Sequence, residues 1–571
     1  MTGEIIGVVI IFLVTILLAW PLGKYITRVF KAEKHFMDFM NPVERFIFRI
    51  SGINPRESMN WKQFLKAMLT INVLWPVYAM LLLIFQDKLP LNPDGNPGQT
   101  PDLAFNTAIS FLVNCNLQHF SGESGLTYLT QLFVITFLQF LSAATGIACL
   151  IALLNGLKEK TTNNLGNFWN YLVKSTTRIL LPLSIIVAVI LAFNGTPASF
   201  DGKDSIVTLQ GDSVQVSRGP AAGMIAIKQI GTNGGGWFGA NSAHPLENPN
   251  YLTNAVETIS IILIPIALVF SLGFYLNRKK LAWIIFGVMT FFCVIFLAIN
   301  IYYETNGNPA IDRMGVSQSL GSMEGKEIRI GSAATALWSV VTTSTSNGSV
   351  NGMHDSLTPI SGGIVMIDMW INSLYGGVGV GLLNYFIFII IAVFIAGLMV
   401  GRTPEFMGHK IEAREVKIAM IVTLLSAFLV KGFTAFAAYM FAHHPEIGWA
   451  VKPSAWLNNP SYHGFSEMLY EYSSANANNG SGFEGLGDSN IFWNVTTGIA
   501  LIVGRYLPII GPIAIVGLLA NKKYIPESPG TLMTDSVTFG VMTIAVIVIV
   551  TALSFFPPMA LGPLAEYFAL Y

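Results

Sequence analysis

Residues 220–236 have the sequence PAAGMIAIKQIGTNGGG, a short apolar segment that runs directly into a loop of glycine and asparagine. An apolar segment of about 10 residues is too short to cross the hydrocarbon of a bilayer as a helix, which takes about 20. Irregular backbone at membrane depth is tolerated only where it is buried in protein or lines a water-filled cavity. The pattern therefore predicts a re-entrant half-helix that ends at an irregular loop.

The same pattern occurs four times along the chain. Apolar segments at 102–113, 220–230, 333–343 and 465–472 precede the loops Asn114-Cys115-Asn116, Thr232-Asn233-Gly234, Ser346-Asn347-Gly348 and Asn478-Asn479-Gly480. A single Asn-Gly pair is usually an ordinary turn, but recurrence at similar intervals indicates one ancestral unit used four times. Asn116 replaces glycine in the first loop, which predicts an asymmetric pore.

The composition is that of a membrane protein. Of 571 residues, 53% are hydrophobic and only 11% are charged, whereas soluble proteins are about 25% charged. Lys+Arg and Asp+Glu are both 32, so no charge excess points to nucleic acid as a partner. Membrane lipid is the expected surrounding, and an ordinary soluble enzyme is excluded.

Ten segments are long and apolar enough to span a membrane. They are 5–23, 67–86, 124–157, 179–200, 258–277, 281–303, 369–401, 417–446 around Lys431, 488–522 around Arg505, and 536–565. We expect an all-α polytopic membrane protein with ten transmembrane helices. Four pseudo-fourfold span, half-helix, span repeats would carry one extra helix at each end.

This organisation predicts six units along the chain. They are an N-terminal helix with a basic loop (1–60), repeat 1 (61–157), repeat 2 (158–280), repeat 3 (281–416), repeat 4 (417–523) and a C-terminal helix (524–571).

Lysine and arginine concentrate in alternate loops, those near 24–56, 158–160, 278–280, 402–414 and 522–523. By the positive-inside rule these loops are cytoplasmic, which places both termini outside. Glu4 stands where a cleaved signal peptide carries basic residues, so the first span is expected to be retained.

Four such loops around one axis would suit a monovalent cation. Unpaired carbonyls can replace the hydration shell of the ion, and half-helices that end at the loops direct their negative dipole ends at it. The only acids near the loops are Glu123 and Glu484, which argues against a divalent ion in the loops, since such ions prefer carboxylates. A potassium-like ion fits best, although composition does not separate K⁺ from Na⁺.

Four charged residues have two interpretations each. Arg505 lies midway along a span, where it could pair with a carboxylate such as Asp368 or act as a fixed positive charge below the loops that limits cation leakage. Lys431 has the same two interpretations, although a long lysine can also extend to the interface. Arg402 and Glu405, in Gly-Arg-Thr-Pro-Glu at 401–405, could form a rigid cytoplasmic contact or a solvated loop.

The chain has no sequence for using ATP. No GxxxxGK[ST] phosphate loop is present, because Gly325-Lys326 is followed by Glu327. An Asp-Lys-Thr-Gly-Thr phosphorylation sequence is also missing, and we expect no catalytic site. A haem- or quinone-binding subunit is disfavoured because the spans hold almost no His, Asp or Glu.

Five stretches together resemble a known family. Asn114-Cys115-Asn116-Leu117-Gln118 with Ser121-Gly122-Glu123, Gly231 to Gly236, Asn351 to Asp355, Gly401 to Glu405 and Asn478 to Ser481 are similar to the potassium-binding A subunit of the bacterial Kdp potassium-transporting ATPases. The resemblance covers essentially the whole chain. It implies the fold of the potassium-transporter superfamily and a multi-pass protein of the bacterial plasma membrane.

The resemblance also implies residues and partners. The potassium selectivity filter would be Asn114, Cys115, Asn116, Thr232, Asn233, Gly234, Ser346, Asn347, Gly348, Asn478, Asn479 and Gly480, with Gln118 beside it and Arg505 beneath it. Asn347 departs from the cysteine of some relatives. The partners would be a P-type ATPase catalytic B subunit that uses the ATP, a C subunit and a small F peptide. The alternative is a self-sufficient channel or symporter of the Trk, Ktr and HKT kind, which shares the fourfold repeat.

Overall fold

The structure is a computed structural model that describes residues 2–159, 161–401, 403–526 and 532–570. Within these residues ten helices are long and apolar enough to cross a membrane, as predicted. They are α1 (Thr2–Phe30), α3 (Trp61–Ile84), the helical segments Tyr128–Lys158 and Phe168–Phe193, α11 (Tyr251–Tyr275), α12 (Lys279–Thr305), α16 (Val380–Val400), α17 (Ala413–His443), α19 (Ile491–Ala520) and α20 (Val537–Met559).

Three of these spans contain a wider π-helical turn. In the first, η3 (Gln131–Thr136) is the wide turn between α6 (Tyr128–Thr130) and α7 (Phe137–Lys158). In the second, η4 (Thr176–Leu180) lies between α8 (Phe168–Ser175) and α9 (Leu181–Phe193). In the third, η8 (Ala560–Leu564) lies between α20 and α21 (Ala565–Leu570). Pro182 follows η4 and Pro563 lies inside η8. Proline cannot donate the usual backbone hydrogen bond, and a wide turn accommodates that loss.

Four half-helices lie between the spans. They are α4 (Pro101–Leu112), α10 (Ala221–Ile230), α14 (Ser332–Ser344) and α18 (Tyr462–Ala477). The first three match the predicted segments to within a residue, but α18 is longer than the predicted 465–472. The residues that it adds are Tyr-His-Gly at 462–464 and Ser-Ser-Ala-Asn-Ala at 473–477. They are mostly small or polar, so hydropathy alone misses them, although burial inside the protein supports a helix there.

The predicted span 369–401 is wrong at its start. A separate helix, α15 (Pro359–Ile371), ends at Asn372, and α16 begins only at Val380. Between them Asn372, Tyr375, Gly377 and Gly379 all have positive φ, a conformation that a helix does not contain. The apolar run is therefore two helices joined by an irregular segment, residues 372–379.

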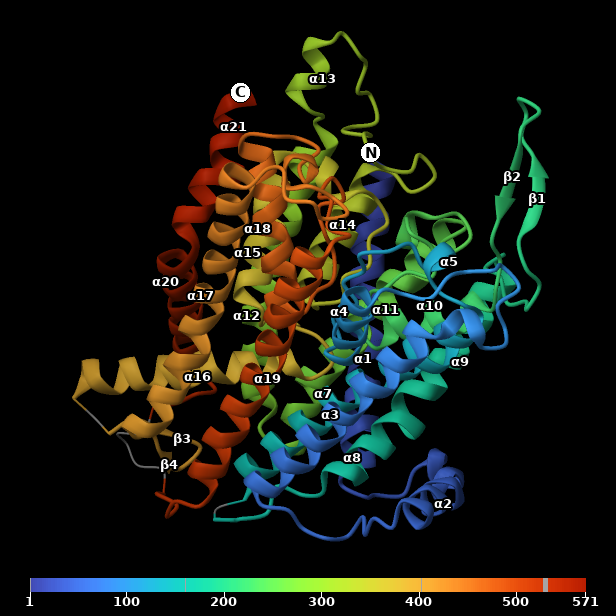
Figure 1. The fold of residues 1–571 in the computed structure, drawn as a ribbon. Coiled ribbons are helices and arrows are strands. Elements are labelled where there is room, and N and C mark those ends of the chain that lie inside the picture. Colours follow the sequence, from blue (N-terminus) through green and yellow to red (C-terminus); the bar gives the residue numbers. More distant parts are fainter. Residues whose placement is uncertain (1, 160, 402, 527–531, 571) are drawn as a thin grey trace.

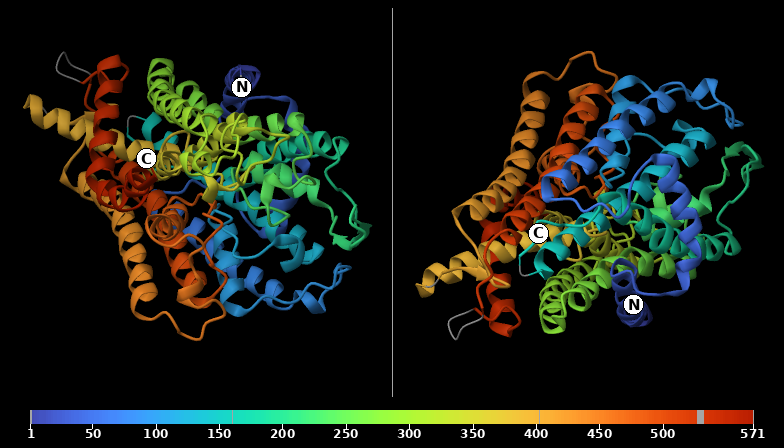
Figure 2. Two further views of the ribbon diagram at one scale, coloured as in Figure 1. Left: turned by 90° about the horizontal axis from the view of Figure 1, so that it is seen from above. Right: turned by 90° about the horizontal axis from the view of Figure 1, so that it is seen from below.

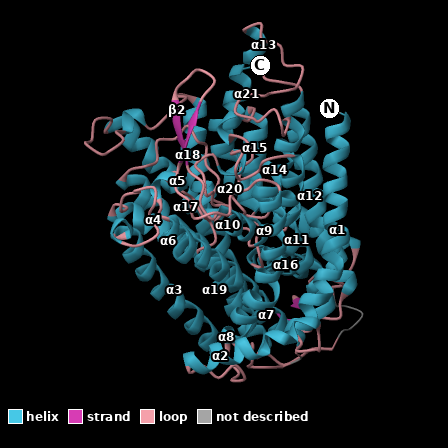
Figure 3. Cartoon of the chain, turned by 90° about the vertical axis from the view of Figure 1, so that its right-hand side faces the viewer, coloured by secondary structure: helices cyan, strands magenta, loops and turns pink. Residues whose placement is uncertain are grey.

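The helices surround a centre in which the loops gather (Figure 2, Figure 3). Both termini lie at the same end of the molecule, and α2 (Asn41–Ser51) lies at the opposite end (Figure 1). α7 is buried along almost its whole length, so it is a wall of the centre and not a lipid-facing helix. α1 packs along α11 at the edge of the bundle, as an added helix should.

Two short hairpins and several single turns were not predicted. β1 (Asp204–Val207) pairs antiparallel with β2 (Ser213–Val216) in an arm that projects from the body, and β3 (Glu405–Phe406) pairs with β4 (His409–Lys410) (Figure 1). The remaining elements are η1 (Phe36–Met40), η2 (Gln86–Lys88), α5 (Gly122–Gly125), η5 (Asn241–Ala243), α13 (Pro309–Arg313), η6 (His354–Ser356) and η7 (Pro453–Ala455).

Candidate cation-binding site

The four loops that follow the half-helices meet in a closed ring; we call residues 114–116, 232–234, 346–348 and 478–480 the ring loops. The loops pack so closely that a Cβ atom added to a glycine of one loop would touch the next loop. A Cβ on Gly234 would lie 2.6 Å from the Asn347 carbonyl carbon, and one on Gly348 would lie 2.8 Å from that of Asn479. A Cβ on Gly480 would lie 2.9 Å from the Cys115 carbonyl carbon, and one on Gly235 would lie 2.8 Å from Asn116 Cβ. The repeats therefore follow one another around one axis.

The backbone of each ring loop alternates in handedness. The first and third positions have positive φ: Asn114 63°, Thr232 47°, Ser346 49° and Asn478 51°, then Asn116 61°, Gly234 87°, Gly348 93° and Gly480 105°. The middle positions are not left-handed. Alternation turns successive carbonyls towards one side, as in a carbonyl-lined filter. Each non-glycine residue in this conformation costs roughly 1–2 kcal/mol, so the surrounding structure must hold it in place.

Most carbonyls of the ring loops have no protein partner. Thr232 O accepts a hydrogen bond from Asn114 Nδ2 at 2.7 Å, and Gly234 O accepts one from Asn241 Nδ2 at 2.7 Å. The other ring-loop carbonyl oxygens accept none from the described residues. Buried carbonyls without partners are rare in folded proteins, and a cation or water is what such a group can bind.

Side chains at the middle positions tie each loop to the neighbouring repeat. Asn347 Nδ2 donates to Lys228 O at 3.1 Å, Asn479 Nδ2 donates to Thr342 O at 2.7 Å, and Cys115 Sγ lies 4.0 Å from Ser474 O. All three acceptors are at the C-terminal end of the preceding half-helix. Asn233 differs, because its Nδ2 donates to Asn114 Oδ1 at 2.7 Å and to Ser142 Oγ at 3.0 Å.

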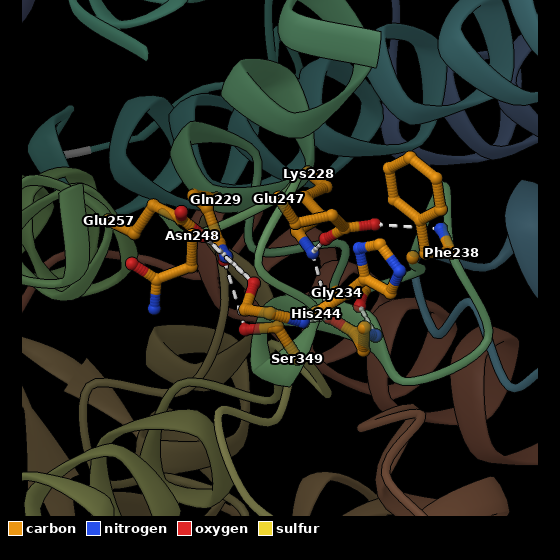
Figure 4. Close-up of polar contacts among 12 residues, drawn as sticks. Lys228, Gln229, Gly234, Phe238, His244, Glu247, Asn248, Glu257 and Ser349 are labelled. Carbon is orange, nitrogen blue, oxygen red and sulfur yellow. Dashed lines mark hydrogen bonds and ion pairs between the residues drawn. The ribbon is translucent and has the colours of Figure 1, made fainter. Parts of the chain in front are cut away.

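A buried ion pair supports the second loop from behind. Lys228 and Glu247 form an ion pair with fully buried side chains (Figure 4). Lys228 Nζ also donates to Asn241 Oδ1 at 2.7 Å, and the same asparagine donates to Gly234 O. Glu247 Oε1 accepts the backbone N–H of Phe238 at 2.9 Å. The pair therefore fixes the backbone on both sides of the ring loop.

Gln118 and Asn116 occupy the junction of the first and second loops. Gln118 Oε1 accepts the Gly236 N–H at 2.7 Å, and its Nε2 donates to Gly236 O at 3.2 Å. Gln118 thus braces the second loop from the side. Asn116 is buried, and both polar atoms of its side chain lack a hydrogen-bond partner among the described residues. The backbone of Asn116 has a positive φ, like the glycines at the third positions of the other loops. The ring is therefore asymmetric in the side chain at this position and not in the backbone.

Arg505 lies next to the ring loops without a carboxylate partner. Its Nη2 donates to Ser142 O at 3.2 Å, and Ser142 Oγ in turn donates to Asn114 Oδ1 at 2.9 Å. Within the described residues no carboxylate forms an ion pair with Arg505. The alternative pairing with Asp368 is wrong, because Asp368 Oδ2 accepts hydrogen bonds from Thr343 and Ser344 at 2.9 and 2.6 Å.

The irregular segment 372–379 lies against the same side of the ring. Val378 N–H donates to Thr232 Oγ1 at 3.1 Å, and a Cβ on Gly377 would be 3.5 Å from Thr345 O. A Cβ on Gly146 would contact Val378 O and would be 3.5 Å from Arg505 Nη2. The predicted span 369–401 runs through this segment without a break, although the glycine run at 376–381 inside a long apolar stretch is a signal for one.

The remaining predicted positions are not part of the ring. Lys431 is exposed on α17, which favours the interpretation that it faces the surroundings. Glu405 lies in the β3–β4 hairpin, and Arg402 lies outside the described residues. Glu123 Oε2 accepts the Gly239 N–H at 2.8 Å, and Glu484 Oε2 accepts the Asp355 N–H at 3.1 Å.

A buried histidine network joins the first and fourth repeats. His119 lies between Asn494 Oδ1 at 2.7 Å and Glu471 Oε1 at 3.1 Å, with Asp488 at 3.9 Å. Burial lowers the pKa of His119, but the Asp488 and Glu471 carboxylates outweigh it and raise the pKa to about 9. The two carboxylates therefore favour the imidazolium form of His119 behind the first loop.

Comparisons with known proteins identify the chain's relatives. The family model described as "Potassium-transporting ATPase A subunit" matches residues 9–568. Proteins named "Potassium-transporting ATPase potassium-binding subunit" from Parabacteroides distasonis and Flavobacterium johnsoniae are 61% and 62% identical, over 100% of this chain and 100% of theirs. The crystal structure of the potassium transporter TrkH from Vibrio parahaemolyticus is similar with a TM-score of 0.52 at 14% identity, covering 88% of this chain and 96% of that one. At that identity the TrkH likeness shows the fold alone.

Proposed function

The chain belongs to the family of potassium-transporting ATPase A subunits, and on that premise we propose that it is the potassium-selecting subunit of an ATP-driven K⁺ importer. The observation that carries the proposal is the closed ring of four loops with alternating backbone handedness. Its buried, unpartnered carbonyls offer neutral oxygens at several levels along one axis. Such oxygens replace the hydration shell of K⁺ without the carboxylates that a divalent ion prefers.

In this function the carbonyls of the ring loops bind the ion, and the side chains set the spacing. Asn347 and Asn479 hold their loops against the neighbouring half-helices, while Gln118 braces the junction of the first two. The rigidity of these contacts keeps the carbonyls at one radius. The half-helix C-termini add partial negative charge directed at the ion.

K⁺ enters from the outside in this proposal, through the side of the ring formed by the third positions. The basic loops would face the cytoplasm of a bacterial plasma membrane, and both termini would be extracytoplasmic. Arg505 would supply a fixed positive charge on the opposite side of the ring, next to the first positions. A buried cation there repels K⁺ and so limits free passage to the cytoplasm.

The ion would leave sideways to a partner that supplies the energy. In the proposed complex a P-type ATPase B subunit hydrolyses the ATP, and a C subunit and a small F peptide complete the assembly. The two extra helices, α1 and α20, and the hairpin that contains Glu405 favour this assembly over a free-standing transporter. The six-unit division of the chain stays a prediction with this proposal.

The direct test is ATP hydrolysis by the complex that co-purifies with this chain in detergent. We expect activity that depends on K⁺, and we expect Gly234→Asp to weaken or abolish that dependence by placing a carboxylate in the ring. Protein yield and unfolding temperature measured on the same samples separate lost folding from lost ion selection. An ATPase that co-purifies but ignores both K⁺ and Gly234→Asp contradicts the proposal.

The second candidate is the alternative that the sequence left open, a self-sufficient K⁺ channel or symporter. It predicts no co-purifying ATPase and passive K⁺ flux through the isolated chain in liposomes. The first experiment therefore decides between the two.

A further inference from the structure

Four acidic side chains and one histidine gather between the third and fourth repeats, outside the ring loops. Asp355 lies in η6, His463 and Glu467 lie in α18, Glu484 follows the fourth ring loop, and Glu566 lies in α21. These elements meet near the end of the molecule that carries both termini (Figure 1). The proposed K⁺ path uses none of these side chains.

Three of them place donor atoms around one point. A His463 ring nitrogen, an Asp355 carboxylate oxygen and a Glu467 carboxylate oxygen all lie within 4.8 Å of one another. His463 Nε2 is 2.9 Å from Asp355 Oδ1. A Cβ on Gly485 would lie 2.6 Å from Asp355 Oδ2 and 2.9 Å from Glu467 Oε1. The two carboxylates therefore converge on a space that a side chain at position 485 would fill.

Glu467 has a feature that an ordinary ion-pair network does not explain. It is fully buried, and its Oε1 accepts the Asn459 N–H at 3.1 Å. Its Oε2 is also buried but has no hydrogen-bond partner among the described residues. No lysine or arginine in the described part of the chain forms an ion pair with Glu467 or Asp355. Buried carboxylates are normally paired or bound to a metal.

The other ring nitrogen of His463 is held by a carboxylate, which orients the ring. Its Nδ1 lies 2.8 Å from Glu566 Oε1, which fixes the ring so that Nε2 points at Asp355. Metal-binding histidines usually donate their second ring N–H to a carboxylate in this way. The arrangement therefore supplies three ligands and one orienting acid.

We propose that Asp355, His463 and Glu467 bind a divalent first-row transition-metal ion, of the Zn²⁺ or Mn²⁺ class. Imidazole suits Zn²⁺, and carboxylates are shared by Zn²⁺ and Mn²⁺. On binding, the proton on His463 Nε2 passes to solvent, and the nitrogen lone pair and one oxygen of each carboxylate bind the ion. The remaining coordination positions are filled by water. The ion joins the third and fourth repeats and, through Glu566, holds the last helix against them.

The test is Zn²⁺ binding by the intact complex, stripped with a chelator and titrated by calorimetry with K⁺ and millimolar Mg²⁺ present. Glu467→Gln and His463→Gln remove ligands. Glu566→Gln leaves all three ligands and removes only the orienting contact. The matched control is His443→Asn, because His443 and His444 are exposed and adjacent and could bind Zn²⁺ adventitiously.

We expect one saturable Zn²⁺ site per chain in the wild type and in His443→Asn. Glu467→Gln and His463→Gln should lose it, and Glu566→Gln should weaken binding by about 10–100-fold, as expected for an orienting partner. Zn²⁺ should also raise the unfolding temperature of the wild type and not that of Glu467→Gln. A wild type that binds no Zn²⁺ or Mn²⁺, binding that survives both ligand variants, or binding lost in His443→Asn overturns the proposal. Calorimetry needs no ATP turnover, so its outcome is independent of the transport proposal.

Discussion

Replacing Gly234 by alanine should displace the ring carbonyl of Asn347. The added methyl carbon would lie 2.6 Å from the Asn347 carbonyl carbon and 2.6 Å from Ser349 N, whereas carbon atoms in contact are about 3.5–4.0 Å apart. The third loop must therefore retreat by about 1 Å. Gly234 also has φ of 87°, which costs alanine about 1–2 kcal/mol, and the overlap adds about 1–3 kcal/mol.

The expected result is a weaker K⁺ dependence of ATP hydrolysis by the purified complex. If about 1.4 kcal/mol of this strain destabilises the ion-bound ring, the affinity for K⁺ falls tenfold. The K⁺ concentration for half-maximal activity should therefore rise by tenfold or more. Gly223→Ala is the matched control, because Gly223 lies in the half-helix before the same loop and a Cβ there has nothing within 4 Å. The control should keep the wild-type K⁺ dependence.

If a Gly234→Ala complex folds, hydrolyses ATP and keeps wild-type K⁺ affinity, the ring is not the binding site. Unfolding temperatures separate this outcome from simple destabilisation. Equal weakening in both alanine variants would contradict the ring site as well, since it would mean that the half-helix and not the ring geometry controls affinity.

Three further changes test other parts of the account. Arg505→Gln removes the charge beside the ring and should increase passive K⁺ flux in liposomes, whereas Arg505→Lys should not; unchanged flux would exclude the proposed role. Lys228→Met leaves Glu247 buried without its partner and should cost about 3–5 kcal/mol, while Lys228→Met with Glu247→Leu should recover part of the loss in thermal unfolding. His119 has a raised pKa of about 9, so its stabilisation is complete below about pH 6.5 and is lost as pH rises through about 9. The unfolding temperature of the wild type should therefore approach that of His119→Gln between pH 7 and 10, and a constant difference would contradict the charged state of this residue.

The sequence was sufficient for the number of spans and for three of the four half-helices. Length and hydropathy determine whether a segment can cross a bilayer, and short apolar segments before Asn-Gly loops are visible without a structure. α18 was predicted too short because the residues at its two ends, 462–464 and 473–477, are mostly small or polar and give no hydropathy signal in isolation. The break at 372–379 was missed because its apolar neighbours on both sides hid the glycine run.

The contacts that hold the ring could not be predicted. The hydrogen bond from Asn347 to Lys228 O joins residues that are 119 positions apart. The ion pair of Lys228 with Glu247 depends on how η5 folds over the second loop. Such pairings follow from the packing of four repeats around one axis, which a single sequence does not specify. For Arg505 the sequence left two interpretations open, and only the position of Asp368 beside Thr343 and Ser344 removed the ion pair.

The ion is expected on the axis between the four ring loops, and anomalous scattering from the purified complex, crystallised with Tl⁺ in place of K⁺, would locate it. We predict an anomalous peak surrounded by carbonyl oxygens of residues 114–116, 232–234, 346–348 and 478–480, and no such peak in the Gly234→Asp variant. A strong peak elsewhere in the chain, with the ring empty, would contradict the account.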